Sequence, residues 1–529
     1  MSLDGFLTFM GLMIATYAIL SPVSRLRLRL NMFRQLALGT VAITLVAFFE
    51  FFFELEALAS GNFDQVFSYF DFSRQPAGFS NQEAAFLVVI VWMLLALLLH
   101  VRAKPRAISL GNLKTLSERL YDEGRYLELV ELVAPYLGTI RKAVEKGLFS
   151  QRLHHRMLDM HLKATNPFFG IHDEGNPLVP KCLASRMRPL ARLVPARRKA
   201  HQSAQEIDDL ILQSDGVRKL LVRLKPEFAM ALMNRSGWKN DEFRTRFFRD
   251  ALNDKASHFY KELMATQNTA GNIGYAIDSK SVLLAGFFDD ASVGAKYGIW
   301  KPVGDEATRM IRSDQEYGKL LNAPCPIDED LWADPVFNTI HFFDIMVTCA
   351  ARQGISDHMW LMYMSVLVRA LEAVHNVTDD RVNLDDEFPT LGNRLIYEAT
   401  FCLRKWVQIV RDLPADSPHK DARALQGVGD VSIPYWAAKD CINAMRCVLR
   451  SERLTESFIT GLLESYMRDV GALSKDAPIS HLRKMMVDEF LLGDLNYGGD
   501  DLRVDVKKYI GGVDHVVRFD VPEFEAALK

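Results

Sequence analysis

The sequence predicts a mostly all-α protein: transmembrane helices at the N-terminus, a large helical cytoplasmic domain, and a small α+β element at the C-terminus. Three observations lead to this prediction. The first 107 residues contain three long apolar runs, the following segments show apolar residues at helical spacing, and the last 50 residues combine clustered glycines with a strand-like VVRFDV segment.

The apolar runs predict three transmembrane helices, at about residues 5–24, 36–53 and 84–101. Residues 84–101 form an eighteen-residue stretch without a formal charge. At the helical rise this stretch covers roughly 27 Å, close to the hydrocarbon thickness of a bilayer. A cleaved signal peptide is the alternative for the first run, but its leading segment, MSLDG, lacks the basic residues that such peptides carry.

The arginines beside these runs predict the orientation of the chain. Basic residues lie in the loop between the first and second runs and directly after the third run: Arg25, Arg27, Arg29, Arg34, Arg102, Lys104 and Arg106. Such residues stay on the cytoplasmic side of short loops. We therefore expect an integral protein of a bacterial inner membrane, with the N-terminus outside and the large C-terminal part in the cytoplasm.

Glu50 is the acidic residue within the second apolar run. Ionisable groups inside a membrane span are costly and often mark function. Glu50 lies near the predicted outer end of its span, so the alternative is a carboxylate that reaches the lipid headgroups. The interfacial position is the interpretation that we favour.

The remaining chain divides by composition into four parts. They are a helical hairpin region at 108–180, a basic linker at 181–205, a helical domain at 206–475 and a small element at 476–529. Residues 116–137 show two amphipathic stretches separated by Gly124, a pattern similar to one unit of a tetratricopeptide array. A second copy at that family's spacing is not found, so we do not infer the family.

Residues 181–199 contain basic side chains and no acid. We call the following five arginines the basic run: Arg186, Arg188, Arg192, Arg197 and Arg198. Three interpretations remain open. The segment is a solvated linker, a contact for anionic headgroups, or a nucleic-acid contact that lacks the aromatic residues needed for base stacking.

Helical periodicity is clearest at 334–353, 357–375, 390–412 and 454–470. Residues 268–304 are richer in glycine and contain the aromatic clusters SVLLAGFFDD and KYGIWKP. We expect these clusters to close a core.

Charge and cysteine content limit the function classes. The chain has 63 basic and 66 acidic side chains, a balance that gives no global attraction to nucleic acid, which is therefore an unlikely partner. The six cysteines form no CxxC pair, and reduced thiols are expected in a cytoplasm.

The sequence contains no phosphate-binding loop, zinc-peptidase motif or serine-hydrolase motif. His341 and Asp344 are three residues apart in an apolar helical segment, where a hydrogen-bonded core pair is commoner than a metal site. We therefore assign no catalytic residue, cofactor or metal ligand.

The function that these observations favour is an interaction scaffold or sensor that is anchored in the membrane and works through protein partners, with homo-oligomers as a further possibility. One alternative is a membrane effector whose cytoplasmic domain senses a signal and whose transmembrane helices form a pore or disrupt the bilayer. A second alternative is an enzyme without a local motif.

Overall fold

The computed structural model describes residues 24–25, 32–51, 81–102, 110–145, 198–266, 275–356, 360–377, 379–429, 432–493 and 501–528. Every regular element in these ranges is a helix, apart from an isolated bridge between Pro324 and Thr390. The mostly all-α prediction is therefore confirmed. The chain forms two compact units, Met1–Val217 and Arg218–Lys529, which we call unit 1 and unit 2.

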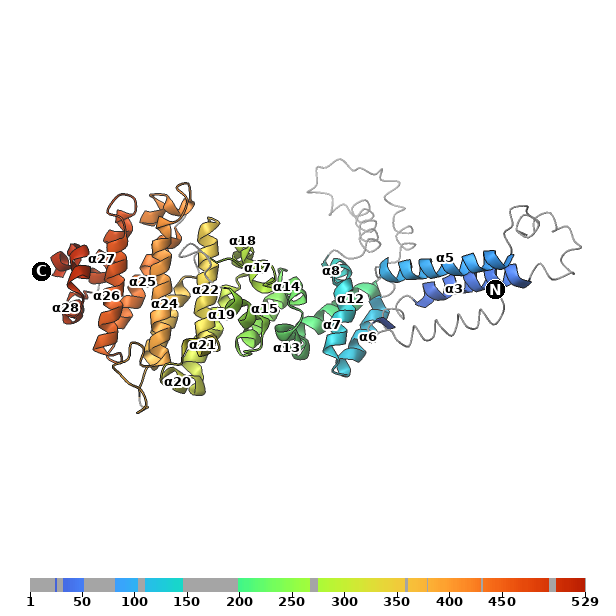
Figure 1. Cartoon of the computed structure of the whole chain (residues 1–529), viewed down its shortest axis with the longest axis horizontal. Coiled ribbons are helices and arrows are strands. Elements are labelled where there is room, and N and C mark those ends of the chain that lie inside the picture. Colours follow the sequence, from blue (N-terminus) through green and yellow to red (C-terminus); the bar gives the residue numbers. More distant parts are fainter. Residues whose placement is uncertain are drawn as a thin grey trace, which may run out of the picture. The chain divides into compact units, whose positions relative to one another are not determined.

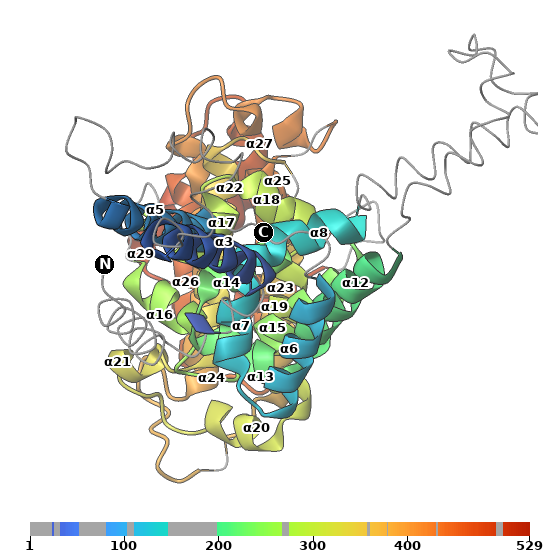
Figure 2. The ribbon, with the colours of Figure 1, turned by 90° about the vertical axis from the view of Figure 1, so that its right-hand side faces the viewer.

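Two apolar helices of unit 1, α3 (Met32–Phe51) and α5 (Asn81–Arg102), pack side by side (Figures 1 and 2). They include most of the second and third apolar runs, whereas residues 5–24 lie outside the described part of the chain. None of the described helices combines the length and the apolarity that a membrane crossing requires.

The second group of helices in unit 1 begins with a helical hairpin. It contains α6 (Leu110–Asp122), α7 (Tyr126–Val133), η4 (Ala134–Tyr136), α8 (Leu137–Glu145) and α12 (Arg198–Gln213). Gly124 turns the chain between α6 and α7 with a φ of 70°, a backbone region that glycine adopts without steric cost.

Helix α12 closes this group by packing against α6 and α8. Its buried positions Ala204, Ile207 and Ile211 recur at helical spacing, and Lys114 of α6 forms an ion pair of 2.7 Å with Glu206. Most of the predicted basic linker 181–205 lies outside the described residues. From Arg198 onward the chain is helical, because these apolar positions give α12 a face to bury.

Unit 2 is an array of helices in which successive elements stand side by side in chain order (Figure 1). The division between the units falls within α13 (Asp215–Arg223). The helices that follow are α14 (Pro226–Met233), α15 (Trp238–Leu252), α16 (His258–Ala265), α17 (Val282–Phe288), α18 (Ala291–Tyr297), α19 (Trp300–Ser313), α20 (Gln315–Leu321), α21 (Asp328–Leu331), α22 (Pro335–Arg352), α23 (Met362–Val374), α24 (Leu391–Gln408), η6 (Ile409–Arg411), η7 (Pro418–Lys420), η8 (Ala424–Gln426), α25 (Ile433–Leu449), α26 (Glu456–Ala472), α27 (Ser480–Leu492), α28 (Arg503–Ile510), α29 (His515–Asp520) and α30 (Pro522–Leu528).

Side-chain caps define where many of these helices begin. In each case a side-chain oxygen of the capping residue accepts a hydrogen bond from a backbone N–H of the first turn, which satisfies a donor that has no partner within the helix. The capping residues are Ser257, Asp290, Asp314, Asp334, Thr390, Ser432, Thr455 and Asp514.

Aromatic side chains fill the core of unit 2 between α15, α16, α17 and α22. Phe248 packs against Phe259, Phe287 and Phe342, with ring centroids 5.6 to 6.3 Å apart. Phe287 and Phe288 are buried, so the aromatic cluster SVLLAGFFDD closes a core as the sequence indicates.

The prediction of a C-terminal α+β element is wrong, because the described residues 501–528 form helices α28, α29 and α30. The strand-like VVRFDV segment is mostly α29. Asp514 caps this helix by accepting a 2.7 Å hydrogen bond from the Val516 N–H, and Val517 is the buried position on it. Tertiary packing and the cap outweigh the β propensity of the valines.

Arg483 of α27 joins these terminal helices to the rest of unit 2. Its guanidinium donates to the carbonyls of Val470 and Gly471 at 3.0 Å. It also donates to the Asp520 carbonyl at 2.9 Å and to the Glu523 carboxylate at 3.0 Å. One buried side chain therefore binds the C-terminal end of α26 and the last two helices together.

Candidate functional site

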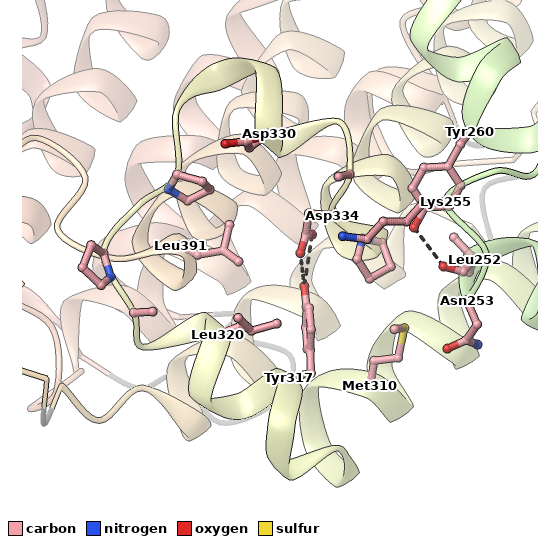
Figure 3. Close-up of a pocket in the computed structure, with 15 residues that line it drawn as sticks. Leu252, Asn253, Lys255, Tyr260, Met310, Tyr317, Leu320, Asp330, Asp334 and Leu391 are labelled. Atoms are coloured by element: carbon pink, nitrogen blue, oxygen red, sulfur yellow. Dashed lines mark hydrogen bonds between the residues drawn. The ribbon is translucent and has the colours of Figure 1, made fainter.

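A pocket of about 380 Å³ in unit 2 is one candidate for a ligand site (Figure 3). This volume falls within the usual range for small-molecule sites. The pocket lies between the α15–α16 turn, α19, α20 and the segment that leads from α20 into α22. Its lining residues are Leu252, Asn253, Lys255, Tyr260, Met310, Tyr317, Leu320, Ala323, Pro324, Pro326, Asp330, Ala333, Asp334, Pro335 and Leu391.

Asp334 is the buried carboxylate of this pocket. It precedes Pro335, which starts α22, and its Oδ1 atom accepts hydrogen bonds from the N–H groups of Val336 at 2.9 Å and Phe337 at 2.8 Å. An aspartate before a proline at the first helical position is a common start for a helix. The cap therefore fixes the carboxylate in the pocket wall.

Tyr317 of α20 holds the other side of this carboxylate. Its hydroxyl lies 2.8 Å from Oδ2 and 3.0 Å from Oδ1 of Asp334, and Figure 3 shows the ring rising toward the carboxylate. Burial and the charge of Asp334 raise the pKa of Tyr317 well above its ordinary value. The hydroxyl therefore remains a donor at physiological pH.

Burial raises the pKa of Asp334 to about 6, although hydrogen bonds from the Phe337 N–H and the Tyr317 hydroxyl oppose this shift. The nearby charge of Lys255 also lowers the pKa of Asp334. Lys255 itself is exposed at the α15–α16 turn. The pocket thus combines a buried, partly desolvated carboxylate with a solvent-facing ammonium group.

The rest of the wall is mainly apolar and aromatic. The Tyr260 hydroxyl donates to the Leu252 carbonyl at 2.8 Å, so its ring is fixed in the wall. Leu320 at the pocket and Ile327, next to the lining residue Pro326, are 58% and 67% exposed. These large side chains give the mouth of the pocket an apolar surface that faces solvent.

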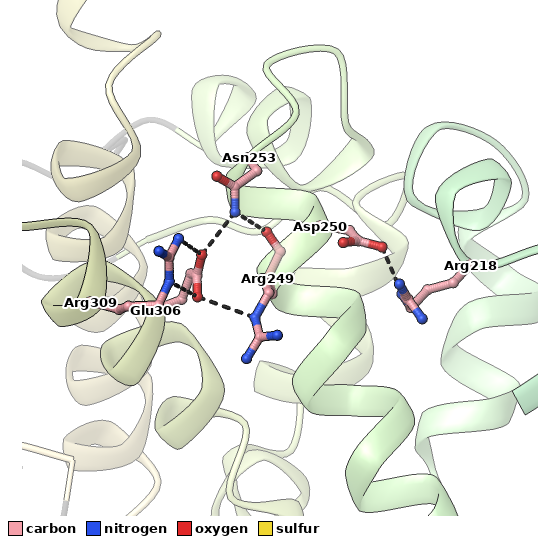
Figure 4. A network of polar contacts seen from close by, with 6 residues as sticks. All are labelled: Arg218, Arg249, Asp250, Asn253, Glu306 and Arg309. Carbon is pink, nitrogen blue, oxygen red and sulfur yellow. Dashed lines mark hydrogen bonds and ion pairs between the residues drawn. The ribbon is translucent and has the colours of Figure 1, made fainter. Parts of the chain in front are cut away.

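A network of polar contacts includes the pocket residue Asn253 (Figure 4). Glu306 is buried; its Oε1 accepts from Asn253 Nδ2 at 2.9 Å and from Arg309 Nη2 at 2.6 Å. Arg249 Nε lies 3.3 Å from Glu306 Oε2. Burial opposes ionisation of Glu306, but hydrogen bonds from Arg309 and Asn253 outweigh it and lower the pKa. Asn253 is therefore held in place as part of the pocket lining.

His341 and Asp344 lie in the core, close to the pocket in sequence but with partners of their own. Asp344 accepts hydrogen bonds from Lys405 Nζ at 2.7 Å and Trp406 Nε1 at 2.8 Å, and Tyr275 also donates to it. Burial lowers the pKa of His341, which favours the neutral ring. No group of three or more potential metal ligands occurs in the described residues.

The surface of the α3–α5 pair is a second candidate. Its contact face contains Ala42, Ala84 and Ala85 together with Val46 and Val89, and Phe49 and Val88 pack against these residues. Many large apolar side chains of the pair are exposed: Leu36, Val41, Ile43, Leu45, Phe86, Leu87, Ile90, Val91, Met93, Leu94, Leu95 and Leu98. The pair therefore carries a large exposed apolar surface.

Most of the residues singled out from the sequence lie outside the described part of the chain. Residues 181–197, including four arginines of the basic run, lie outside the described residues, and Arg198 is the first residue of α12. Glu50 belongs to the last turn of α3, but its side chain lies outside the described part. The described cysteines Cys349, Cys402, Cys441 and Cys447 are free thiols.

Sequence reasoning missed the pocket because its polar groups come from separate segments. The pair Asp334 and Pro335 is visible as a helix start, but the sequence does not show that Tyr317 and Lys255 face the same cavity. No family model, curated protein or solved structure matches the chain.

Proposed function

We propose that this chain is a membrane-attached interaction protein. Its first 107 residues hold it in a membrane, and its helical unit 2 acts on the cytoplasmic side as a scaffold or sensor for protein partners. The observation that carries this proposal is the packing of α3 and α5, in which small side chains and two valines, Val46 and Val89, form the contact while many large apolar side chains are exposed.

This packing is typical of helices surrounded by lipid. Lipid gives no hydrophobic driving force for burying leucine between two helices, so small residues that allow close backbone approach are favoured at the interface. The Thr40 and Thr44 hydroxyls donate to carbonyls one turn earlier, each at 2.9 Å, which satisfies these polar groups without water.

The cytoplasmic placement of unit 2 rests on the basic residues that flank the apolar runs. Arg25, Arg27 and Arg29 follow the first run, and Arg102, Lys104 and Arg106 follow the third. Both groups are expected on the same side of the membrane, together with the chain that follows.

Exposed apolar side chains on the terminal helices support protein partners. Val504 of α28 is 79% exposed, and Val516 and Phe519 of α29 are 65% and 77% exposed. Val516 and Phe519 are three residues apart and so share one face of their helix. Large exposed apolar groups of this kind are typical of protein interaction surfaces.

Membrane attachment is tested with Leu94→Asp, which places a charge on the outward surface of α5. A charged residue at the centre of a membrane helix costs about 2.5 to 3.5 kcal/mol, so we expect a more than tenfold loss of chain from the carbonate-resistant membrane fraction. Leu384→Asp is the matched control, because Leu384 is also exposed, at 48%, but lies in unit 2. Equal membrane fractions for the two variants would contradict attachment through α5.

The partner role is tested by purifying the full chain in mild detergent and identifying proteins that remain bound in fixed ratio. Val516→Ser with Phe519→Ser should release such a partner while leaving membrane attachment intact. Dye release from liposomes by the wild-type chain, triggered through unit 2, would replace the scaffold with the membrane effector. Turnover of a substrate by the purified chain would replace it with an enzyme.

A further inference from the structure

We propose that the pocket around Asp334 binds an organic cation: an amine or guanidine with an apolar body. This goes beyond the scaffold role and does not depend on membrane attachment. The positive group would meet the Asp334 carboxylate, and the apolar body would lie along the aromatic and aliphatic wall of the pocket.

The hydrogen bonds of Asp334 leave one carboxylate oxygen available to a ligand. Oδ1 accepts from the Val336 N–H and the Phe337 N–H, and the Tyr317 hydroxyl, which has a single proton, lies 3.0 Å (O···O) from Oδ1 and closer, at 2.8 Å, to Oδ2. Among the described residues, Oδ2 accepts only from Tyr317, and a carboxylate oxygen has two acceptor positions. An ammonium N–H fits the second position and forms a charge-assisted hydrogen bond, which is stronger than a neutral one.

The electrostatic balance of the site favours a cation over an anion. Asp334 is buried, so its charge is poorly screened, whereas Lys255 is exposed and its charge is screened by water. A carboxylate ligand would meet the Asp334 charge in the interior. A bound cation would stabilise the negative charge of Asp334 more strongly than the exposed Lys255 ammonium does.

The wall suits an apolar body with an aromatic or branched aliphatic group. Tyr260 and Tyr317 present rings, and Met310 and Leu252 add flexible and branched aliphatic surface. A cation near the face of a tyrosine ring gains a further attraction. The exposed Leu320 at the mouth extends this apolar surface outward.

The test uses the full chain in detergent and three probes of nearly equal shape: 2-phenylethylamine, 2-phenylethanol and 3-phenylpropionate. Binding is measured by calorimetry, with the signal of protein-free detergent solution subtracted to remove partition into the micelle. We expect the amine to bind at least tenfold more tightly than the alcohol or the acid. Asn still caps a helix well, so Asp334→Asn should fold, as circular dichroism would show, while losing at least tenfold in amine affinity.

The Lys255→Met variant tests whether the pocket prefers a positively or a negatively charged ligand. This change keeps the aliphatic stem and removes the ammonium, so amine affinity should rise by roughly threefold as a competing positive charge disappears. Tyr317→Phe, which keeps the ring and frees a position on Asp334, should leave the preference for the amine intact. The proposal is overturned if the acid binds best and Lys255→Met weakens it, or if wild type and Asp334→Asn respond alike to the amine.

Discussion

Glu262 gives unit 2 a stability that depends on pH, and Glu262→Gln tests this dependence. The carboxylate is 5% exposed. It accepts hydrogen bonds from the N–H groups of Leu283 at 2.9 Å and Leu284 at 2.9 Å, at the start of α17. Burial outweighs these bonds and raises the pKa of Glu262 from 4.5 to about 7.

A raised pKa means that the folded chain holds this proton more tightly than the unfolded chain. The stabilisation linked to Glu262 is therefore complete below about pH 4.5, decreases as the pH rises, and is lost above about pH 7. A shift of this size corresponds to roughly 3 kcal/mol, since each pKa unit is about 1.4 kcal/mol. Glutamine keeps a carbonyl acceptor for α17 but does not titrate.

We therefore expect the free energy of unfolding of Glu262→Gln, relative to wild type, to increase by roughly 3 kcal/mol between pH 4.5 and pH 8. The assay is denaturant unfolding of the full chain in detergent, followed by tryptophan fluorescence at a series of pH values. Glu316→Gln is the matched control, because Glu316 is exposed and pairs with Lys319 on the surface. A Glu262→Gln difference that stays constant with pH would refute the reasoning.

Three further predictions follow from the packing. Arg483→Met should lower the free energy of unfolding of unit 2 by about 2 to 4 kcal/mol, because it leaves buried carbonyls without donors. Proteolysis should then begin in residues 501–528. Cleavage that starts elsewhere would contradict the role of Arg483 in holding the terminal helices. Gly124→Ala should lower the free energy of unfolding by about 1 kcal/mol, because Gly124 has a positive φ. Gly138→Ala, in α8, should raise the free energy of unfolding by up to about 1 kcal/mol. Thermal melts in which both variants shift the melting temperature in the same direction would refute this prediction. Replacing the basic run with glutamines should leave the melting temperature of unit 2 unchanged, as solvated charges contribute little; a loss of salt-sensitive binding to anionic vesicles or nucleic acid would instead exclude the linker interpretation.

Periodicity predicted four of the long helices of unit 2, namely α22, α23, α24 and α26, although the predicted segment 357–375 begins before α23, which starts at Met362, and α15, α19 and α25 were not predicted. The predicted segment 334–353 is α22, and 390–412 contains α24 and η6. The residues at which these two helices begin can be recognised within the segments themselves, since Asp334 and Thr390 are capping residues. Local signals of this kind can be read without knowledge of the rest of the fold.

The features that sequence reasoning missed depend on contacts between distant segments. The VVRFDV segment has β propensity, but its packing beside α26 and its link through Arg483 make it helical. The pocket likewise needs α15, α20 and α22 to meet. Glu262 lies in an ordinary amphipathic sequence, and only its burial beneath α17 gives it an unusual pKa.

The measurement that tests the central claim most directly is the topology of the full chain in a bacterial membrane. Compartment-specific reporters are fused after Lys529 and, separately, into the loop near Ser80. The account predicts that the C-terminal fusion is active only as a cytoplasmic reporter and that the Ser80 fusion is active only as an external one. An externally active C-terminal fusion, or a chain recovered entirely from the aqueous fraction, would contradict membrane attachment with a cytoplasmic unit 2.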